Sequence, residues 1–445
     1  MSITRLLQQA SGGSGVSGDP DFADVSLLLD GDGANGANNN TFTDSSSVGA
    51  TVTPYQMSQG SFSPYAASFP LNMTTSGGSG HFAGSRSYVS LPDNDAYCPE
   101  AGDFTLEAWL YTQKQNAYQV IWSKWSAGQQ EIFLFIGTTN KLSLTLGTQS
   151  SGTTIESTGT IPADQWTHIA VVRNGNALYL YINGTQSGSI AYSGNVPNRS
   201  ADVYIGDYAL QGYYPFDGYI SDVRWVKGTA VYTGNFTPPT SPLTATSNTK
   251  ALLNFQDAGI YDLSGTSDIF TNNSAQVSTS VKKYGTGSLD LRSSKFLGTT
   301  TADSFDVGGV FTVEFWVNYA STSGNQTLID SDATSEFYIA YYSGRIYVAN
   351  RGSNVLTPLH TPVVGQWYHY AVVCDGSTYK IYVDGQLLET SSTVSSQVID
   401  AWGIGARSNG TSLPSNCYID DLRITKGVAR YTANFTPPTE ALPKF

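Results

Sequence analysis

Few carboxylates in this chain are placed to hydrolyse a glycosidic bond. Retaining hydrolysis needs two carboxyl groups about 5–5.5 Å apart, and acids two residues apart on one β-strand would supply that spacing. The chain has eight glutamates and contains no E-x-D-x-E run. Glu100, Asp103 and Glu107 lie three and four residues apart, and Glu314 stands alone on its candidate strand. We therefore assign no catalytic residue and expect a protein that is not an enzyme.

Two histidines occupy matching sequence contexts, His168 in Q-W-T-H and His369 in Q-W-Y-H. Nucleophilic catalysis of the Ser-His-Asp type would require a serine on a sharp strand-to-helix turn. The sequence has no such motif, and we expect both histidines to be structural.

Loops rich in aspartate, asparagine and glycine could bind calcium, because hard cations take several carboxylate and carbonyl oxygens. The clearest example is Asp30-Gly-Asp32-Gly, with Asp44-Ser-Ser further along the chain. Ordinary turn chemistry, in which Asp and Asn bond their own backbone, explains the same composition. The candidate calcium ligands are Asp30, Asp32, Asp44 and Asp222 in the first half of the chain and Asp257, Asp262 and Asp421 in the second.

Aromatic residues gather in one loop of the first half, D-Y-A-L-Q-G-Y-Y-P-F over residues 207–216. The corresponding loop of the second half, A-R-S-N-G-T-S-L-P-S-N-C over residues 406–417, contains no aromatic residue. Exposed rings suit stacking on sugar faces, burial against another subunit, or packing within the domain, and the sequence leaves these three roles open. The candidate binding residues are Tyr208, Tyr213, Tyr214, Phe216, Trp122 and Trp125.

The first ten residues contain a short apolar stripe, Ile3, Leu6 and Leu7, at helical spacing before a Gly/Ser-rich stretch. So short a helix is not stable alone in water. We therefore predict that residues 1–20 are an anchor and linker that docks on another protein of an assembly.

Charge and apolar patterning exclude several classes of protein. The net charge of −13 disfavours nucleic acids and anionic membranes as partners. No apolar run is long enough to span a bilayer, and the first residues show no apolar core of a secretion signal. Three scattered cysteines cannot form a disulfide framework.

Two repeats of about 200 residues account for most of the chain. F-T-L-E-A-W-L at 104–110 returns as F-T-V-E-F-W-V at 311–317, and Q-W-T-H-I-A-V-V at 165–172 returns as Q-W-Y-H-Y-A-V-V at 366–373. Residues 219–243 match residues 418–442, and both segments contain K-G-x-A-x-Y-T-x-N-F-T-P-P. We predict one domain over residues 21–245 and a second over residues 249–445.

Strand periodicity runs through both repeats. In residues 104–110 the alternate residues Phe104, Leu106, Ala108 and Leu110 share one face. Asn-Gly at 183–184 and Asp-Gly at 384–385 are typical of tight hairpins. Short strands separated by Gly, Asn and Asp indicate an all-β chain made of two tandem antiparallel jelly rolls.

These motifs resemble the laminin-G-like, concanavalin A-like jelly-roll domains: the F-T-x-E-x-W strand, the W-x-H-x-A-V-V strand, the Asn/Asp-Gly hairpin and the terminal D-x-R segment. The ending K-G-x-A-x-Y-T-x-N-F-T-P-P is similar to that of structural proteins of tailed bacteriophages. The resemblance implies a fold and not one activity, since the superfamily contains lectins, hydrolases and adhesion modules. It also implies calcium at the domain rim as a cofactor to test.

Taken together, the sequence predicts a non-enzymatic component of a bacteriophage virion, in a tail fibre, tail or capsid decoration. Its partners would be other virion proteins, further copies in a homo-oligomer, and host-surface glycans, without nucleic acid or membrane insertion. A secreted or cell-surface lectin-like adhesin is the alternative, and a polysaccharide-degrading enzyme is the third class.

Overall fold

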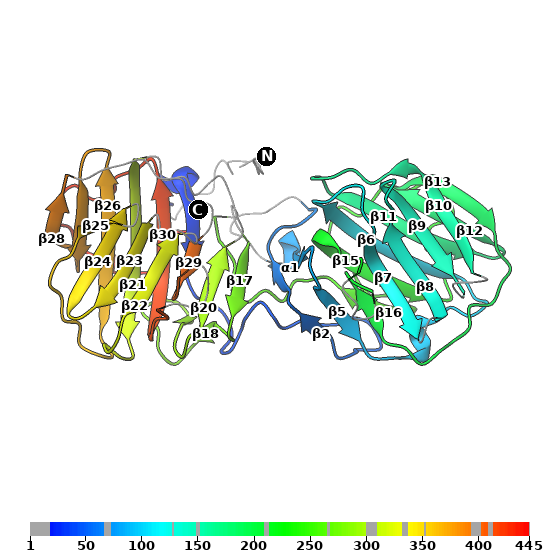
Figure 1. Ribbon diagram of the computed structural model, residues 1–445, viewed down its shortest axis with the longest axis horizontal. Helices are drawn as coiled ribbons and strands as arrows, with labels where there is room; N and C mark the ends of the chain where they lie inside the picture. Colours follow the sequence, from blue (N-terminus) through cyan, green and yellow to red (C-terminus); the bar gives the residue numbers. More distant parts are fainter. Residues whose placement is uncertain are drawn as a thin grey trace. The chain divides into compact units, whose positions relative to one another are not determined.

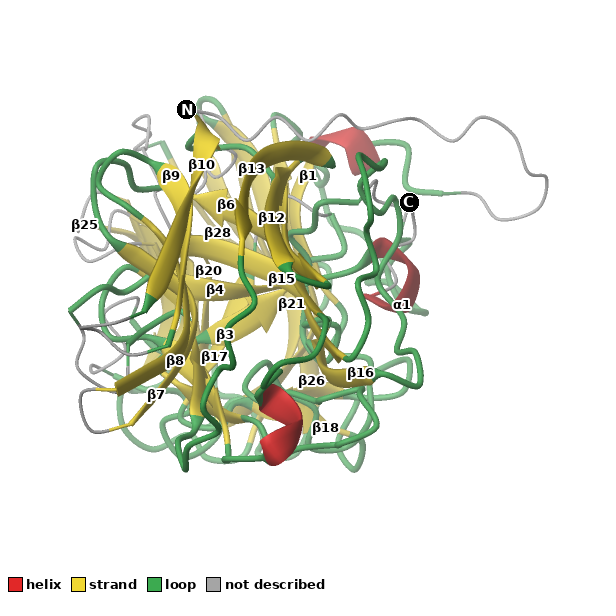
Figure 2. Cartoon of the chain, turned by 90° about the vertical axis from the view of Figure 1, so that its right-hand side faces the viewer, coloured by secondary structure: helices red, strands yellow, loops and turns green. Residues whose placement is uncertain are grey.

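The computed structural model describes residues 18–65, 73–126, 129–147, 152–208, 213–264, 268–299, 309–331, 337–350, 353–392, 402–407 and 413–444. The candidate anchor residues Ile3, Leu6 and Leu7 lie outside these ranges. Strands dominate the described chain, and the helical segments are single turns (Figure 2). They are η1 (Phe22–Asp24), α1 (Met73–Ser76) and η2 (Asp95–Tyr97). None of the described helices is long and apolar enough to cross a membrane.

The chain forms two compact units. We call residues 40–65 and 73–257 the first jelly roll, and residues 18–39 and 258–444 the second jelly roll. Each consists of antiparallel sheets whose buried faces enclose a hydrophobic core. The predicted all-β, two-jelly-roll fold is confirmed.

The first jelly roll has two sheets within the described residues. The seven-stranded sheet runs in the order β10 (Thr153–Thr160), β9 (Lys141–Leu146), β8 (Gln129–Ile136), β7 (Gln119–Ser126), β14 (Val203–Ile205), β5 (Tyr88–Leu91) and β2 (Thr53–Tyr55). The eight-stranded sheet runs β13 (Thr185–Ala191), β12 (Ala177–Ile182), β11 (Thr167–Asn174), β6 (Phe104–Thr112), β15 (Asp217–Lys227), β4 (Ser79–Ala83) and β3 (Ser58–Gly60), with β16 (Thr249–Leu253) also paired to β15.

The second jelly roll repeats this arrangement over its described segments. Its eight-stranded sheet runs β18 (Gln276–Ser278), β19 (Ser288–Asp290), β30 (Cys417–Lys426), β21 (Val310–Tyr319), β26 (Trp367–Asp375), β27 (Tyr379–Val383) and β28 (Gln386–Ser391), with β1 (Val25–Leu29) also paired to β30. Its seven-stranded sheet runs β17 (Ile269–Asn272), β20 (Phe296–Thr299), β29 (Trp402–Ile404), β22 (Gln326–Ser331), β23 (Phe337–Tyr342), β24 (Arg345–Asn350) and β25 (Ser353–Leu356).

Alternation along the strands builds the cores. On β6 the predicted inward set, Phe104, Leu106, Ala108 and Leu110, is fully buried in the first core. The predicted hairpin at Asn183-Gly184 joins β12 to β13, where Gly184 has a φ of +73° that suits a residue without a Cβ.

The opening strands of the two repeats are exchanged. In Figure 1 the blue strand at the start of the chain, β1, lies beside the red strand β30 of the second jelly roll. Conversely, β16 pairs with β15 of the first jelly roll. The structure therefore corrects the predicted boundaries of 21–245 and 249–445: residues 18–39 belong with the second repeat and residues 249–257 with the first. Both opening strands end in three apolar residues, so sequence alignment alone could not assign their partners.

Candidate functional site

A buried carboxylate organises the eight-stranded sheet of the first jelly roll. Glu107 on β6 is fully buried, and its Oε1 accepts from Arg224 Nη2 at 2.6 Å and Nε at 2.8 Å. Its Oε2 lies 3.2 Å from His168 Nε2 and accepts from the Tyr232 hydroxyl at 2.7 Å. Burial alone would raise the pKa of Glu107, but the histidine, the arginine and the tyrosine outweigh it and hold that pKa below its usual value.

The second jelly roll contains the same cluster. Glu314 contacts His369 at 3.3 Å, Arg423 at 2.6 Å and the Tyr431 hydroxyl at 2.7 Å. Burial opposes ionisation here too, yet these partners lower the pKa of Glu314 to about 2. Each glutamate therefore stays charged at neutral pH with both oxygens engaged by neighbouring side chains.

The cluster lies beneath the segment that carries the repeated Y-T-x-N-F motif. Tyr232 and Phe236 stack with ring centroids 3.6 Å apart, and Phe236 also packs against His168 at 5.6 Å. The segment approaches the β12–β13 hairpin so closely that a Cβ on Gly184 would lie 1.8 Å from the Phe236 carbonyl oxygen. The motif therefore covers the outer face of the eight-stranded sheet, and the glutamate secures it.

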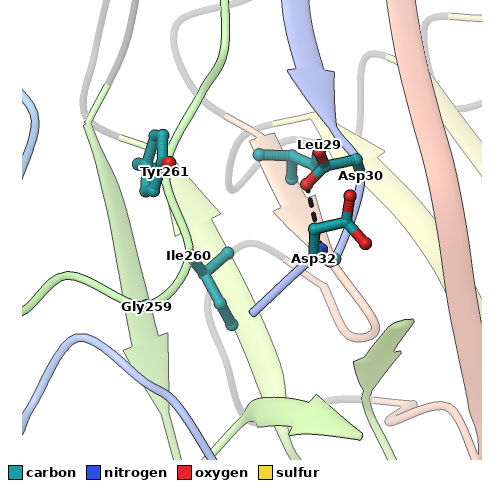
Figure 3. Close-up of a pocket in the computed structure, with 7 residues that line it drawn as sticks. Leu29, Asp30, Asp32, Gly259, Ile260 and Tyr261 are labelled. Carbon is teal, nitrogen blue, oxygen red and sulfur yellow. Dashed lines mark hydrogen bonds between the residues drawn. The ribbon is translucent and has the colours of Figure 1, made fainter. Parts of the chain in front are cut away.

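A second group of carboxylates lies in the second jelly roll, beside a small pocket lined by residues 29–32 and 259–261 (Figure 3). Asp30 turns back to accept from the Asp32 backbone N–H at 3.0 Å. The Lys444 ammonium contacts Asp30 and lies 3.1 Å from Asp32 Oδ2. Although burial opposes it, the two carboxylates raise the pKa of Lys444, so a protein cation already neutralises this pair.

The neighbouring acids Asp420 and Asp421 are less well compensated. Burial, together with the charge of Asp421, raises the pKa of Asp420 to about 8. Burial also raises the pKa of Asp421 to about 7, with the nearby Asp30 adding to the effect. In the first jelly roll the residue equivalent to Asp421 is Asp222, where burial raises the pKa to about 6 while Tyr65 and Asn254 donate hydrogen bonds.

The candidate calcium ligands do not come together as predicted. Asp30 and Asp32 lie in the second jelly roll, whereas Asp44 and Asp222 lie in the first because the opening strands are exchanged. Likewise, Asp257 lies in the first jelly roll, apart from Asp262 and Asp421.

Most of these carboxylates already bond to the backbone. Asp44 accepts from the N–H groups of Leu252, Ser46 and Ala50. Asp262 accepts from Leu28 N–H in the same way, and Asp257 accepts from Thr43 N–H. Within the described ranges, no group of three or more His, Cys, Asp or Glu side chains has a metal-binding arrangement.

Aromatic rings cover the outer face of the seven-stranded sheet of the first jelly roll. Successive ring centroids lie 4.7–6.5 Å apart along a continuous path. We call this path the aromatic surface; its members in order are Trp125, Tyr208, Phe133, Phe135, Tyr118, Tyr214 and Tyr213. Phe133 and Phe135 alternate on β8 with the core residues Ile132, Leu134 and Ile136, which places both rings on the outer face.

Three rings of the aromatic surface are open to solvent: Tyr213 is 69% exposed, Tyr118 45% and Tyr214 37%. Burial and the adjacent Tyr214 raise the pKa of Tyr208 to about 12, so its hydroxyl remains a neutral donor. The surface therefore offers flat apolar rings edged by phenolic hydroxyls.

Two of the six predicted aromatic residues are not part of this surface. Trp122 is fully buried and stacks 6.0 Å from Trp225 in the core. Phe216 is also fully buried and packs edge-on against Phe82 at 6.0 Å. Ile121 and Trp122 are consecutive on β7 and both belong to the core, because the register of this strand shifts just before Trp122.

Tyr118, Phe133 and Phe135 belong to the aromatic surface but were not predicted. The signal for them is the sequence I-F-L-F-I on β8, which is apolar on both faces although one face borders solvent. The matching strand β23 reads F-Y-I-A-Y-Y, and places Tyr338, Ala340 and the 44%-exposed Tyr342 outside its core. On this face Tyr342 contacts Tyr347 at 6.1 Å, and over its described residues the second jelly roll thus has a sparser version of the seven-ring aromatic surface.

Matches to the family model of the concanavalin A-like lectin/glucanases superfamily cover residues 83–230 and 294–430. The chain therefore belongs to this superfamily and contains two of its laminin-G-like domains. No curated protein matches the chain.

The solved structures to which the chain is similar are distant in sequence. Domain 4 of AbnA, an extracellular arabinanase of Geobacillus stearothermophilus solved with arabinotriose, is 17% identical over 37% of this chain and 86% of that one, with a TM-score of 0.32. Domains LG4-5 of the mouse laminin alpha1 chain are 12% identical over 82% and 95%, with a TM-score of 0.28. A structure named as a carbohydrate-binding protein of Bacteroides ovatus is 21% identical over 44% and 54%, with a TM-score of 0.33.

Proposed function

We propose that the chain is a non-enzymatic carbohydrate-binding protein whose first jelly roll binds a neutral glycan on the aromatic surface. The observation that carries this proposal is the run of seven contacting rings on a sheet face, three of them more than a third exposed. Exposed apolar patches of this kind mark binding sites in soluble proteins. The superfamily to which the chain belongs includes lectins, which supports the same role.

The chemistry of the rings favours a sugar. A pyranose ring has apolar C–H faces and hydroxyl edges, and a tyrosine offers a complementary apolar face with a hydrogen-bonding tip. The net charge of −13 disfavours strongly acidic polysaccharides by repulsion. We therefore expect a neutral ligand.

The absence of hydrolysis is part of the proposal. Glu107 and Glu314 sit on matching strands, but both are fully buried and engaged by arginine, histidine and tyrosine. A general acid or nucleophile must reach the glycosidic oxygen or the anomeric carbon. Incubation with polysaccharides that bind should release no reducing sugar.

For the biological setting we propose a bacteriophage virion, where copies of the chain form a homo-oligomer with other virion proteins and display the glycan site. The repeated motif K-G-x-A-x-Y-T-x-N-F-T-P-P supports this setting, because it resembles the motif of structural proteins of tailed bacteriophages. Mass spectrometry of purified particles should detect the chain at stoichiometric amounts. Its detection instead in the medium or on the cell surface, without particles, would favour the secreted or cell-surface adhesin.

The binding test compares the wild type with Tyr213→Ser/Tyr214→Ser in a co-sedimentation assay with insoluble neutral polysaccharides and host envelope extract. We expect the double variant to lose at least tenfold in affinity, because it removes two of the three exposed rings of the aromatic surface. The fold should be retained, because neither ring belongs to the core. Ligand binding should also change the tryptophan fluorescence of the wild type, since Trp125 contacts Tyr208 at 4.7 Å.

The matched control is Tyr342→Ser, which removes an exposed tyrosine from the second jelly roll. This variant should bind as the wild type does. Unchanged binding by the Tyr213→Ser/Tyr214→Ser protein, with an unchanged melting temperature, would refute the aromatic surface as the site.

A further inference from the structure

The exchanged strands β1 and β16 occupy equivalent positions. Leu27, Leu28 and Leu29 lie opposite Ile424, Arg423 and Leu422 of β30. Ala251, Leu252 and Leu253 lie opposite Trp225, Arg224 and Val223 of β15. The register is the same in both jelly rolls, so backbone pairing alone would allow either strand to fill either place.

The hydrogen bonds around the strands are equally interchangeable. Leu28 N–H donates to Asp262 Oδ1 at 3.0 Å, and Leu263 N–H donates to the Leu28 carbonyl. In the first jelly roll, Leu252 N–H donates to Asp44 Oδ1 at 2.9 Å, and Ser45 N–H donates to the Leu252 carbonyl.

Chain connectivity does not force the exchange either. Residues 30–43 connect β1 to Asp44 of the first jelly roll, and residues 254–261 connect β16 to Asp262 of the second jelly roll. Each connection is long enough for its strand to turn back and pair within its own repeat.

Side-chain size does distinguish the two arrangements. In the first core the small Ala251 lies opposite the large Trp225, and both are fully buried. In the second core two medium side chains, Leu27 and Ile424, lie opposite each other, and both are fully buried.

Pairing within each repeat would change both fits. It would place Leu27 against Trp225, which overpacks the first core, and Ala251 against Ile424, which leaves a cavity in the second. Overpacking and cavities both destabilise a close-packed interior.

We propose that this size matching makes each repeat supply its opening strand to the sheet of the other repeat. The two repeats should therefore stay associated after the chain between them is cut. This inference is independent of the proposed glycan site. It makes the two repeats one interlocked unit, since each continuous repeat supplies a strand that only the other can pack well.

The test is a protease recognition site inserted after Ala245, in the exposed stretch 244–248 that precedes β16. Cleavage of the folded chain gives two fragments, each holding one strand of the other jelly roll. The fragments should co-elute in gel filtration at the volume of the intact chain. Separation into two species of about half the mass would overturn the proposal.

The reversal variant is Leu27→Ala/Ala251→Leu in the same cleavable chain. Its smaller β1 side chain matches Trp225 and its larger β16 side chain matches Ile424, so pairing within each repeat becomes the better fit. We expect this variant to fold and its cleaved fragments to separate. Continued co-elution, or failure of the variant to fold, would contradict the size-matching argument.

The single variants provide a second readout. Leu27→Ala and Ala251→Leu should each lower the melting temperature by several degrees, whereas the double variant should lose less than the sum of the two. If the two strands could not change places, Leu27 and Ala251 would act independently in separate cores, and their losses of melting temperature would add. Additive losses would therefore overturn the proposal.

Discussion

At the scale of single residues, the two buried glutamates show why a carboxylate on a strand need not be catalytic. Glu107 and Glu314 occur at the same repeat position with the same arginine, histidine and tyrosine partners. Removing one member of a buried, hydrogen-bonded ion pair leaves its partner charged and unsatisfied, which is strongly destabilising. The duplicated cluster is therefore best explained as a structural element of the repeat.

Glu314→Gln should lower the free energy of unfolding by about 3 kcal/mol at pH 7, because the cost of breaking such a pair is about 3–5 kcal/mol. The folded-state pKa of Glu314, about 2, lies below its unfolded value of 4.5. Its stabilisation is therefore complete above pH 4.5 and is lost as the pH falls through 2. Urea unfolding of wild type and variant should converge toward pH 2, and a constant difference from pH 7 to pH 2 would contradict this assignment.

Lys444 occupies the place of a cation between Asp30 and Asp32. We propose that calcium binding here is limited by this ammonium. Lys444→Ala should therefore respond to 5 mM calcium with a larger rise in melting temperature than the wild type, since a ligand that binds only the native state stabilises it by mass action. Differential scanning fluorimetry with calcium, magnesium and chelator provides the comparison, and equal responses to calcium would rule out this group as a calcium site.

At the scale of elements, the segment with the Y-T-x-N-F motif determines which sheet face remains open. Ala230, Tyr232 and Phe236 pack on the outer face of the eight-stranded sheet, against Ala170 and Val172. The same segment docks in the second jelly roll, where Tyr431 and Phe435 stack at 3.6 Å. In the first jelly roll, the face with the aromatic surface is not the one that this segment covers.

Gly184→Ala should destabilise the first jelly roll by about 2 kcal/mol or more, because the added Cβ would lie 1.8 Å from a carbonyl oxygen in a φ > 0 turn. Thermal unfolding should show the loss, together with faster proteolysis near residues 229–238. The matched control is Gly175→Ala, which also has φ > 0 but would place its new Cβ with no heavy atom within 4 Å. Equal losses for both variants would show that backbone strain, rather than segment docking, explains the effect.

Local patterns in the sequence predicted most elements but not all of their partners. The alternation at Phe104–Leu110 and the Asn-Gly hairpin predicted strands that the structure contains. The partner of β1 could not be predicted, because V-S-L-L-L and T-K-A-L-L both end in three apolar residues and their distinction depends on Trp225 and Ile424 across the sheet. Trp122 was misplaced because shifts in register on β7 redirect its side chains.

At the scale of the whole molecule, duplication has produced two domains with one scaffold and different surfaces. Both contain the glutamate cluster and the docked segment. The first carries seven contacting rings on its open sheet, whereas the outer positions of β23 in the second are Tyr338, Ala340 and Tyr342. A duplicated scaffold that keeps its core and changes one face is consistent with a single binding function per chain.

Isothermal titration with a soluble neutral oligosaccharide should therefore give one site per chain, not two. Tyr213→Ser/Tyr214→Ser should remove the binding heat, while Tyr342→Ser should leave the stoichiometry at one. Among the described residues of the second face, Tyr342 pairs with Tyr347 and is not part of a run of rings like the aromatic surface. If copies assemble on a particle, the site count per chain stays at one, but binding to an immobilised polysaccharide tightens through avidity. A stoichiometry of two would mean that the sparser face of the second jelly roll also binds sugar, and that ring number is not what limits recognition in this fold.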